Sequence, residues 1–89
     1  MNAIVTVIGR DRVGIIAAVC GKLGELNVNI LDITQTILKG NFTMVMSVDA
    51  GKANVEFDQL ATALEKLGEQ MSLSIRIQRE EIFDAMHRI

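Results

Sequence analysis

The sequence has 89 residues, 49% of them hydrophobic, and a formal net charge of -2 at pH 7 with a pI near 5.2. This length supports one hydrophobic core and excludes a second domain, and the acidic balance argues against a nucleic-acid surface, which needs a basic stripe. No apolar run approaches the roughly 20 residues of a membrane span, and the N-terminal residues lack the features of a signal peptide. The single cysteine, Cys20, excludes an intramolecular disulfide and fits a reducing compartment. We therefore expect a soluble, cytoplasmic protein whose rich apolar supply is partly buried against another subunit.

The first third of the chain predicts a strand followed by a helix. Residues Ala3 to Ile8 are apolar on both faces except at Thr6, as in a central strand. From about Val13 to Leu26, apolar residues at helical spacing predict a helix, and Asn27 is suited to a left-handed C-cap. The stripe expected to face the core consists of Ile16, Val19, Cys20, Leu23 and Leu26.

Two strands joined by a tight turn are predicted next. The second strand is expected from Val28 to about Leu38, followed by the hairpin-type turn Lys39-Gly40-Asn41. Strands joined by so short a turn must be antiparallel. The third strand alternates strictly, and its apolar face carries Phe42, Met44, Met46 and Val48.

The remaining sequence predicts a second helix and a fourth strand. Asn54 is positioned to cap a helix whose apolar residues, from Phe57 to Met71, recur at intervals of three and four. The fourth strand is expected from Ser72 to Gln78. The order strand, helix, strand, strand, helix, strand requires two right-handed crossovers. It predicts one α+β domain with a ferredoxin-like fold, a four-stranded antiparallel sheet with two helices on one face and a core over residues 3–78.

The tail, residues 79–89, predicts a short helix from Glu81 to Ile89. A helix of this length does not hold alone in water, so we expect it to be buried against protein. The expected receiver is the open face of the sheet, which includes Val45, or the same region of a neighbouring subunit. The apolar face of this helix consists of Ile82, Phe83, Met86 and Ile89.

The stretch from Ile8 to Ile16 is a strand-to-helix turn suited to a ligand. A helix that begins there directs free backbone N–H groups and a partial positive charge outward, which favours a small anion such as an amino-acid carboxylate. Asp11 is a candidate N-cap, and Gly14 leaves space for a ligand to approach the backbone. The alternative is a well-capped turn that binds nothing, since most such turns have no ligand.

Catalytic, metal-binding and cofactor-binding patterns are not evident in the sequence. The only histidine, His87, lies in the tail, and Cys20 lies on the stripe expected to be buried. Gly9 and Gly14 lack the spacing of a nucleotide-binding loop, and there is no Cys-x-x-Cys pair. RNA-binding proteins of this fold stack bases on aromatic strand residues, for which only Phe42 is available. We therefore expect no enzyme activity, no cofactor, no metal and no nucleic-acid partner.

Two segments resemble the ACT domain, a small regulatory module that senses amino acids: Asp11-Arg12-Val13-Gly14-Ile15-Ile16-Ala17 and Asn27-Val28-Asn29-Ile30-Leu31-Asp32-Ile33. The last eight residues are similar to the ending of small stand-alone bacterial ACT proteins akin to the regulator of the glycine cleavage system. The resemblance covers about residues 3–78. It implies that the chain pairs, often edge to edge through the second strand, and binds an amino acid between subunits. By position, the implied ligand contacts are Asp11, Val13, Gly14 and Ile15 in the turn, and Asn29 and Ile30 in the second strand. Arg12 lies in the same turn and is a further candidate ligand contact.

These observations lead to two hypotheses of different class. The first is a homo-oligomeric regulatory module that binds an amino acid or similar small carboxylate and is read by a partner protein. The second is a structural pairing module that has no ligand. In this fold the two ligand-contacting clusters lie at opposite ends of the first helix, so one chain does not join them in a compact pocket, whereas two chains can. We expect at least a dimer, with the apolar second strand at a sheet edge and no membrane association.

Overall fold

The elements follow the predicted order. The computed structural model describes residues 1–87, and it describes side chains for residues 1–82 and 84. The elements are β1 (Asn2–Arg10), α1 (Ile15–Glu25), β2 (Asn29–Leu38), β3 (Asn41–Asp49), α2 (Phe57–Met71), β4 (Ser74–Arg79) and α3 (Glu80–His87).

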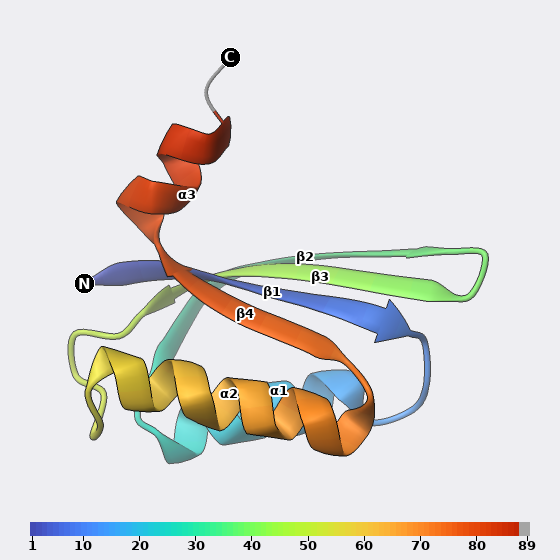
Figure 1. Cartoon of the computed structure of the whole chain (residues 1–89), viewed down its shortest axis with the longest axis horizontal. Coiled ribbons are helices and arrows are strands. Elements are labelled where there is room, and N and C mark those ends of the chain that lie inside the picture. Colours follow the sequence, from blue (N-terminus) through green and yellow to red (C-terminus); the bar gives the residue numbers. More distant parts are fainter. Residues whose placement is uncertain (88–89) are drawn as a thin grey trace.

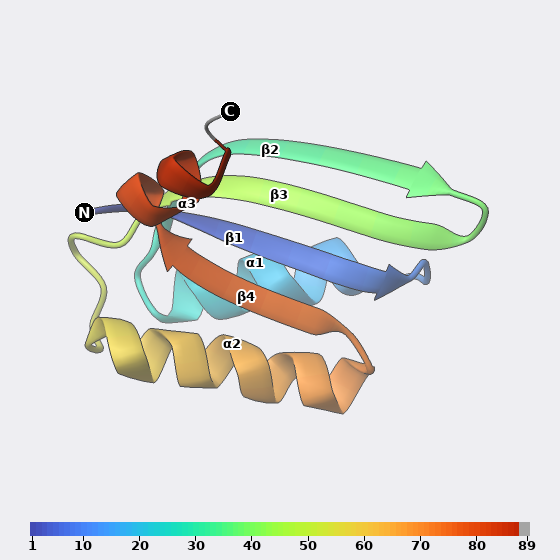
Figure 2. The ribbon, with the colours of Figure 1, turned by 45° about the horizontal axis from the view of Figure 1, so that its top comes forward.

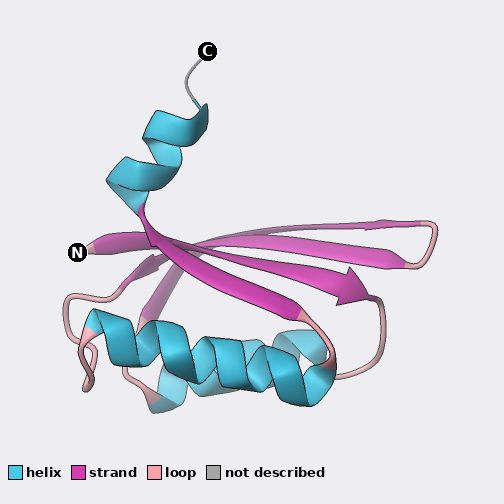
Figure 3. Cartoon of the chain, in the orientation of Figure 1, coloured by secondary structure: helices cyan, strands magenta, loops and turns pink. Residues whose placement is uncertain are grey.

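The four strands form one antiparallel sheet in the order β2-β3-β1-β4, and α1 and α2 cover one of its faces (Figure 1, Figure 2, Figure 3). The predicted ferredoxin-like α+β fold is therefore confirmed. As expected, β2 lies at one edge of the sheet, while β4 lies at the other. Within the described part of the chain, no helix is long and apolar enough to cross a membrane.

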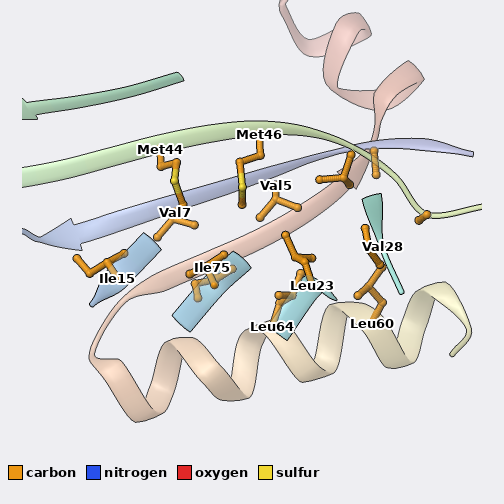
Figure 4. Packing of buried hydrophobic residues seen from close by; sticks show 14 of the residues in the cluster. Val5, Val7, Ile15, Leu23, Val28, Met44, Met46, Leu60, Leu64 and Ile75 are labelled. Atoms are coloured by element: carbon orange, nitrogen blue, oxygen red, sulfur yellow. The ribbon is translucent and has the colours of Figure 1, made fainter. Parts of the chain in front are cut away.

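The core lies between the sheet and the two covering helices. Side chains from β1 and β3, among them Val5 and Met46, meet Leu23 of α1 and Leu64 of α2 in one apolar layer (Figure 4). The predicted inner face of the third strand is confirmed, because its four apolar residues are all buried. Fully burying side chains of this size stabilises the fold by roughly 1.5–3 kcal/mol each. Phe42 is one of them, so it offers no surface on which a base could stack.

The start of α1 differs from the prediction. The helix begins at Ile15, and its N-cap is Gly14, with a φ of 95° and no side-chain hydrogen bond to the first turn. The predicted N-cap, Asp11, was wrong, because the helix starts three residues later than an aspartate cap at that position requires. The predicted core-facing stripe is confirmed at Val19 and Leu23, which are buried, and at Cys20 and Leu26, which pack against the core. It is wrong at Ile16, which is 39% exposed, because Ile15, at 2% exposed, faces the core instead. One residue corresponds to a rotation of about 100° on a helix, so the buried stripe begins at Ile15.

The start of α2 corrects a second capping prediction. Its N-cap is Glu56, which forms a capping box with Gln59, so Asn54 is not the cap. Asn54 instead joins the loop to the end of α1, since its Nδ2 donates to the Glu25 carbonyl oxygen at 3.1 Å. Ser72, predicted as the first residue of the fourth strand, has a φ of 57° and caps the end of α2.

Two positive-φ positions match their predictions. Asn27 has a φ of 61°, and the N–H groups of Asn27 and Val28 donate to the carbonyl oxygens of Gly24 and Leu23, which closes α1 with a Schellman motif. Lys39 and Gly40 have φ values of 54° and 79°, as in a two-residue type I′ hairpin turn. The predicted hairpin and helix C-cap are therefore confirmed.

The register determines which backbone groups point to the free edges of the sheet. Leu38 pairs with Asn41 across the two-residue turn, and such a pair exchanges both hydrogen bonds. Because hydrogen-bonded pairs alternate along the ladder, Ile33, Gln35 and Ile37 of β2 direct their N–H and C=O groups away from β3. The same alternation, continued across β3 and β1, leaves Ile75 and Ile77 of β4 facing outward.

The tail forms the expected helix, and it departs from the sheet on the face opposite α1 and α2 (Figure 1). It contacts β1 and β4, and Ile4, which lies on this open face, is only 9% exposed. Ile82 is 49% exposed, so the prediction of burial is wrong for this residue within one chain. The other three members of the predicted apolar face, Phe83, Met86 and Ile89, lie outside the described side chains.

Candidate ligand-binding site

The turn between β1 and α1 is held by contacts from two distant parts of the chain. The Asp11 N–H donates to the Gly40 carbonyl oxygen at 2.9 Å, which attaches the turn to the β2–β3 hairpin. The Arg12 Nη2 donates to the Met71 carbonyl oxygen at 2.6 Å, at the end of α2. Arg12 therefore holds the turn against α2, so its direct role at a ligand is limited. The sequence does not reveal this contact, because its partners are 59 residues apart.

The turn presents an open helix N-terminus. No side chain caps the first turn of α1, and no acidic residue lies in it. Its backbone N–H groups therefore carry an uncompensated partial positive charge. Val13 and Gly14 are exposed beside these groups, and the side chain of Asp11 is exposed as well. Ile15 is buried, so it has only backbone groups to offer a ligand. The turn is thus suited to a small carboxylate.

Asn29 and Ile30 lie at the other end of α1, about 16 Å away for a helix of this length. Asn29 lines a separate pocket of about 370 Å³ with Asn27, Asp49 and Lys52 among its walls. Ile30 is half-buried and is packed against the core. Within one chain, the structure brings together the residues of the turn but does not bring Asn29 and Ile30 to them, as the sequence analysis expected.

The β2 edge connects these two clusters and carries exposed apolar side chains. Ile33 and Ile37, which are 39% and 54% exposed, pair with core residues of β3 and therefore lie on the face that α1 and α2 cover. A β-bulge at Leu31 interrupts the ladder, and the adjacent Asp32 Oδ1 accepts a hydrogen bond from the Ile33 N–H at 2.9 Å. The Asp32 carboxylate thus accepts a hydrogen bond from the Ile33 N–H, one of the β2 donors that point away from β3. No sequence signal indicated the bulge.

Outside the turn and the β2 edge, two side chains, Asp49 and Cys20, have shifted pKa values. The Gly51 N–H and the N-terminal ammonium, whose nitrogen lies 3.4 Å from the Asp49 Oδ1, lower the pKa of Asp49. Burial raises the pKa of the Cys20 thiol, which keeps this cysteine protonated. In the described part of the chain, no three His, Cys, Asp or Glu side chains gather as metal ligands.

Comparison with known proteins agrees with the fold. The sequence matches the ACT domain over residues 2–78. This chain belongs to the ACT domain family. A UPF0237 protein of Listeria innocua is 53% identical over 89 residues, which cover all of both chains. The structure of an ACT domain protein from Streptococcus pneumoniae is 42% identical, with a TM-score of 0.82 over 98% of each chain.

A third similarity extends the comparison to longer regulatory proteins. A structure described as a candidate glycine cleavage system transcriptional repressor is 26% identical, with a TM-score of 0.76 over 86% of this chain and 44% of that one. ACT domains are regulatory modules that typically bind amino acids and form oligomers. The resemblance found in the sequence is thereby confirmed at the level of the family.

Proposed function

We propose that this ACT domain is a regulatory module that binds a free amino acid, or a similar small carboxylate, between two copies of the chain. The observation that carries the proposal is the placement of the two ligand clusters at opposite ends of the unpaired β2 edge. The turn is attached to the hairpin that ends β2, through Asp11, and Asn29 begins β2.

If two copies of the chain are related by a two-fold axis through the middle of β2, the two ligand clusters of different copies come together. Two β2 strands paired antiparallel lie with the end of one strand beside the start of the other. The α1 N-terminus of one copy then approaches Asn29 and Ile30 of the partner. Pairing also removes Ile33 and Ile37 from water, which favours association by roughly 1.5–3 kcal/mol for each side chain fully buried. The exposed apolar edge therefore supports both the dimer and the shared site.

The two polar ends of an amino acid find complementary groups in this arrangement. Its carboxylate accepts hydrogen bonds from the first-turn N–H groups of α1, beside Val13 and Gly14. Its ammonium is matched by the exposed carboxylate of Asp11, and the partner's Asn29 adds hydrogen-bonding groups. A ligand bound only by the paired form stabilises pairing, and a partner protein reads that change. The unpaired Cys20 suits this role in the reducing cytoplasm.

The second candidate is a pairing module without a ligand. The engagement of Arg12 with the Met71 carbonyl oxygen favours it, because the turn loses the cation that could neutralise a carboxylate. In this case β2 edges pair as above, but the α1 N-terminus remains hydrated.

Thermal shift with each of the twenty amino acids distinguishes the two candidates. A ligand at about 100 times its Kd adds about 2.7 kcal/mol to the free energy of unfolding, which raises the Tm of a domain this small by roughly 10 °C or more. A saturable rise with one amino acid or a few supports the regulatory module. A flat panel, together with a light-scattering mass of twice 9.8 kDa, supports the pairing module.

A further inference from the structure

The sheet has a second free edge, formed by β4 on the side away from β1 (Figure 2). The register leaves the N–H and C=O groups of Ile75 and Ile77 pointing outward there. Ile75 is only 4% exposed and lies against Gly68 of α2, so the half-buried Ile77 is the accessible part of this edge. Among the residues that the structure describes, no strand pairs with β4 on this side. An unpaired edge of this kind is a template for another extended segment.

A groove of about 580 Å³ follows this edge between β4 and α2. Ala61, Ile75 and Ile77 contribute apolar surface to it, while Glu65 and Glu69 of α2 add two carboxylates. These carboxylates are one helical turn apart and therefore lie on one face of α2. Both side chains are exposed, and no ion pair between described residues involves either of them. Arg76 of β4 also lines the groove, from the strand side. The groove thus combines a hydrogen-bonding edge and one basic residue on β4 with two carboxylates on α2 that form no ion pair with described residues.

The pairing geometry determines the chemistry of the segment that fits this groove. In an antiparallel pair, residues directly opposite Ile75 and Ile77 exchange hydrogen bonds with them and point to the same face of the sheet. That face is the one that α2 covers, where Glu65 and Glu69 lie. Every second residue of an added strand is therefore directed toward the carboxylates, and lysine or arginine complements them.

A second copy of the chain fits this edge poorly. In a two-fold pair of β4 strands, the α2 helices of both copies lie on one face of the joined sheet, near the axis. Glu65 and Glu69 of one copy then approach the same carboxylates of the other, and like charges oppose the contact. The β2 edge has no such pair of carboxylates on its helix-covered face, where Ile33 and Ile37 lie.

We propose that the groove between β4 and α2 is the docking site for an extended, basic segment of a partner protein, which adds antiparallel to β4 as a fifth strand. Backbone hydrogen bonds, chiefly to Ile77, supply affinity, and the contacts with Glu65 and Glu69 supply specificity. This inference goes beyond the proposed function and does not depend on whether the turn binds an amino acid.

The first test uses the full chain and a fluorescein-labelled heptapeptide of alternating lysine and valine, with capped ends. Fluorescence anisotropy should show saturable binding. The variant Glu65→Gln/Glu69→Gln should bind it roughly three- to tenfold more weakly, as two exposed ion pairs predict. The matched control Glu25→Gln/Glu81→Gln changes the net charge equally but lies outside the groove, and it should bind with unchanged Kd. Equal weakening in both variants overturns the proposal, because it shows attraction by net charge alone.

The second test identifies the backbone contact. Two further peptides of the same sequence carry N-methyl groups either on the lysines or on the valines. Antiparallel addition requires the lysine N–H groups, since lysines face α2, so methylation of lysines should abolish binding and methylation of valines should preserve it. Equal binding of the two methylated peptides overturns strand addition. Neither test requires an amino-acid ligand, so failure of the proposed function leaves both results interpretable.

Discussion

The two edges of this sheet have the same backbone chemistry but opposite side-chain surroundings. At the β2 edge, Ile33 and Ile37 are exposed on the helix-covered face, and the candidate ligand-binding turn lies beside the hairpin. At the β4 edge, the corresponding face carries Glu65 and Glu69 beside the buried Ile75 and the half-buried Ile77. An apolar edge pairs with an identical edge, whereas an acidic edge repels its own copy and accepts a basic partner. On the two proposals made above, the difference would let one small sheet keep self-association and partner binding at separate edges.

The largest expected effect comes from placing charge on the β2 edge. In Ile33→Lys/Ile37→Lys, two apolar contacts per chain are lost and lysines of two copies face each other. We expect the dimer to dissociate at least 100-fold more readily. Analytical ultracentrifugation measures this constant. The control Thr34→Lys/Thr36→Lys places the same charges on the open face of β2 and should leave the dimer largely intact. An unchanged dimer in the first variant contradicts pairing through this edge.

Gly68 tests the other side of the molecule, where α2 meets β4. A Cβ at this position comes within 2.6 Å of the Leu73 carbonyl oxygen, so the backbone must shift in Gly68→Ala. We expect a loss of about 1–3 kcal/mol in the free energy of unfolding, measured by urea denaturation. The dimer constant of the folded fraction should not change, because β2 is remote. If dimerisation fell together with stability, the two edges would not be independent.

Gly14→Val tests the turn at the end of the β2 edge. The new Cβ meets no atom within 4 Å, but a φ of 95° is unfavourable for a β-branched residue. We expect a cost of about 1–2 kcal/mol and loss of amino-acid binding with most of the fold retained. Calorimetric titration and circular dichroism measure the two quantities. Retained affinity in the folded variant would place the ligand elsewhere.

Removal of residues 81–89 tests whether the tail supports association. We expect the Tm to fall by several degrees and the dimer to weaken, because the helix packs on β1 and β4 and has an apolar face to offer a neighbouring copy. Differential scanning calorimetry and light scattering check both expectations. A truncated chain with the Tm and mass of the full chain would show that the tail contributes nothing to either.

The smallest effect concerns the pH dependence at Asp49. The Gly51 N–H and the N-terminal ammonium lower the pKa of Asp49 in the folded state. A lowered folded-state pKa stabilises the protein above the pKa of the unfolded state, and this contribution is lost as the pH falls through the folded value. We expect Asp49→Asn to flatten the acid side of the stability curve slightly, as measured by Tm against pH. The association of both edges should be unaffected.

The fold was accessible from the sequence because its signals are local and repetitive. The strict alternation of the third strand, the glycine-containing hairpin turn and the positive φ of Asn27 each follow from residues adjacent in the chain. The N-caps were less accessible, since several polar residues near each helix start compete for the position. At the start of α1, periodicity alone did not resolve whether Ile15 or Ile16 faces the core.

The candidate site was predictable only in part. The turn with Asp11 and Gly14 was found from the strand-to-helix pattern, and the ACT resemblance added Val13, Ile15, Asn29 and Ile30 as ligand contacts. The separation of the two clusters within one chain follows from the fold. The roles of two side chains were not accessible, because both depend on tertiary contacts. Arg12 reaches a carbonyl oxygen at the far end of α2, and Asp32 turns back on the Ile33 N–H at a bulge that no sequence pattern marks.

The strand order β2-β3-β1-β4 also sets the valency of the assembly. Joining two β2 edges produces a continuous eight-stranded sheet, in which the two β4 edges form the outer rims. Seven interstrand spacings separate them, a distance of roughly 34 Å. A partner that carries two basic segments on a linker of matching span can occupy both rims at once, and its avidity then exceeds the affinity of either groove. Dissociation of the dimer halves that valency, so a ligand that controls pairing also controls how firmly such a partner is held.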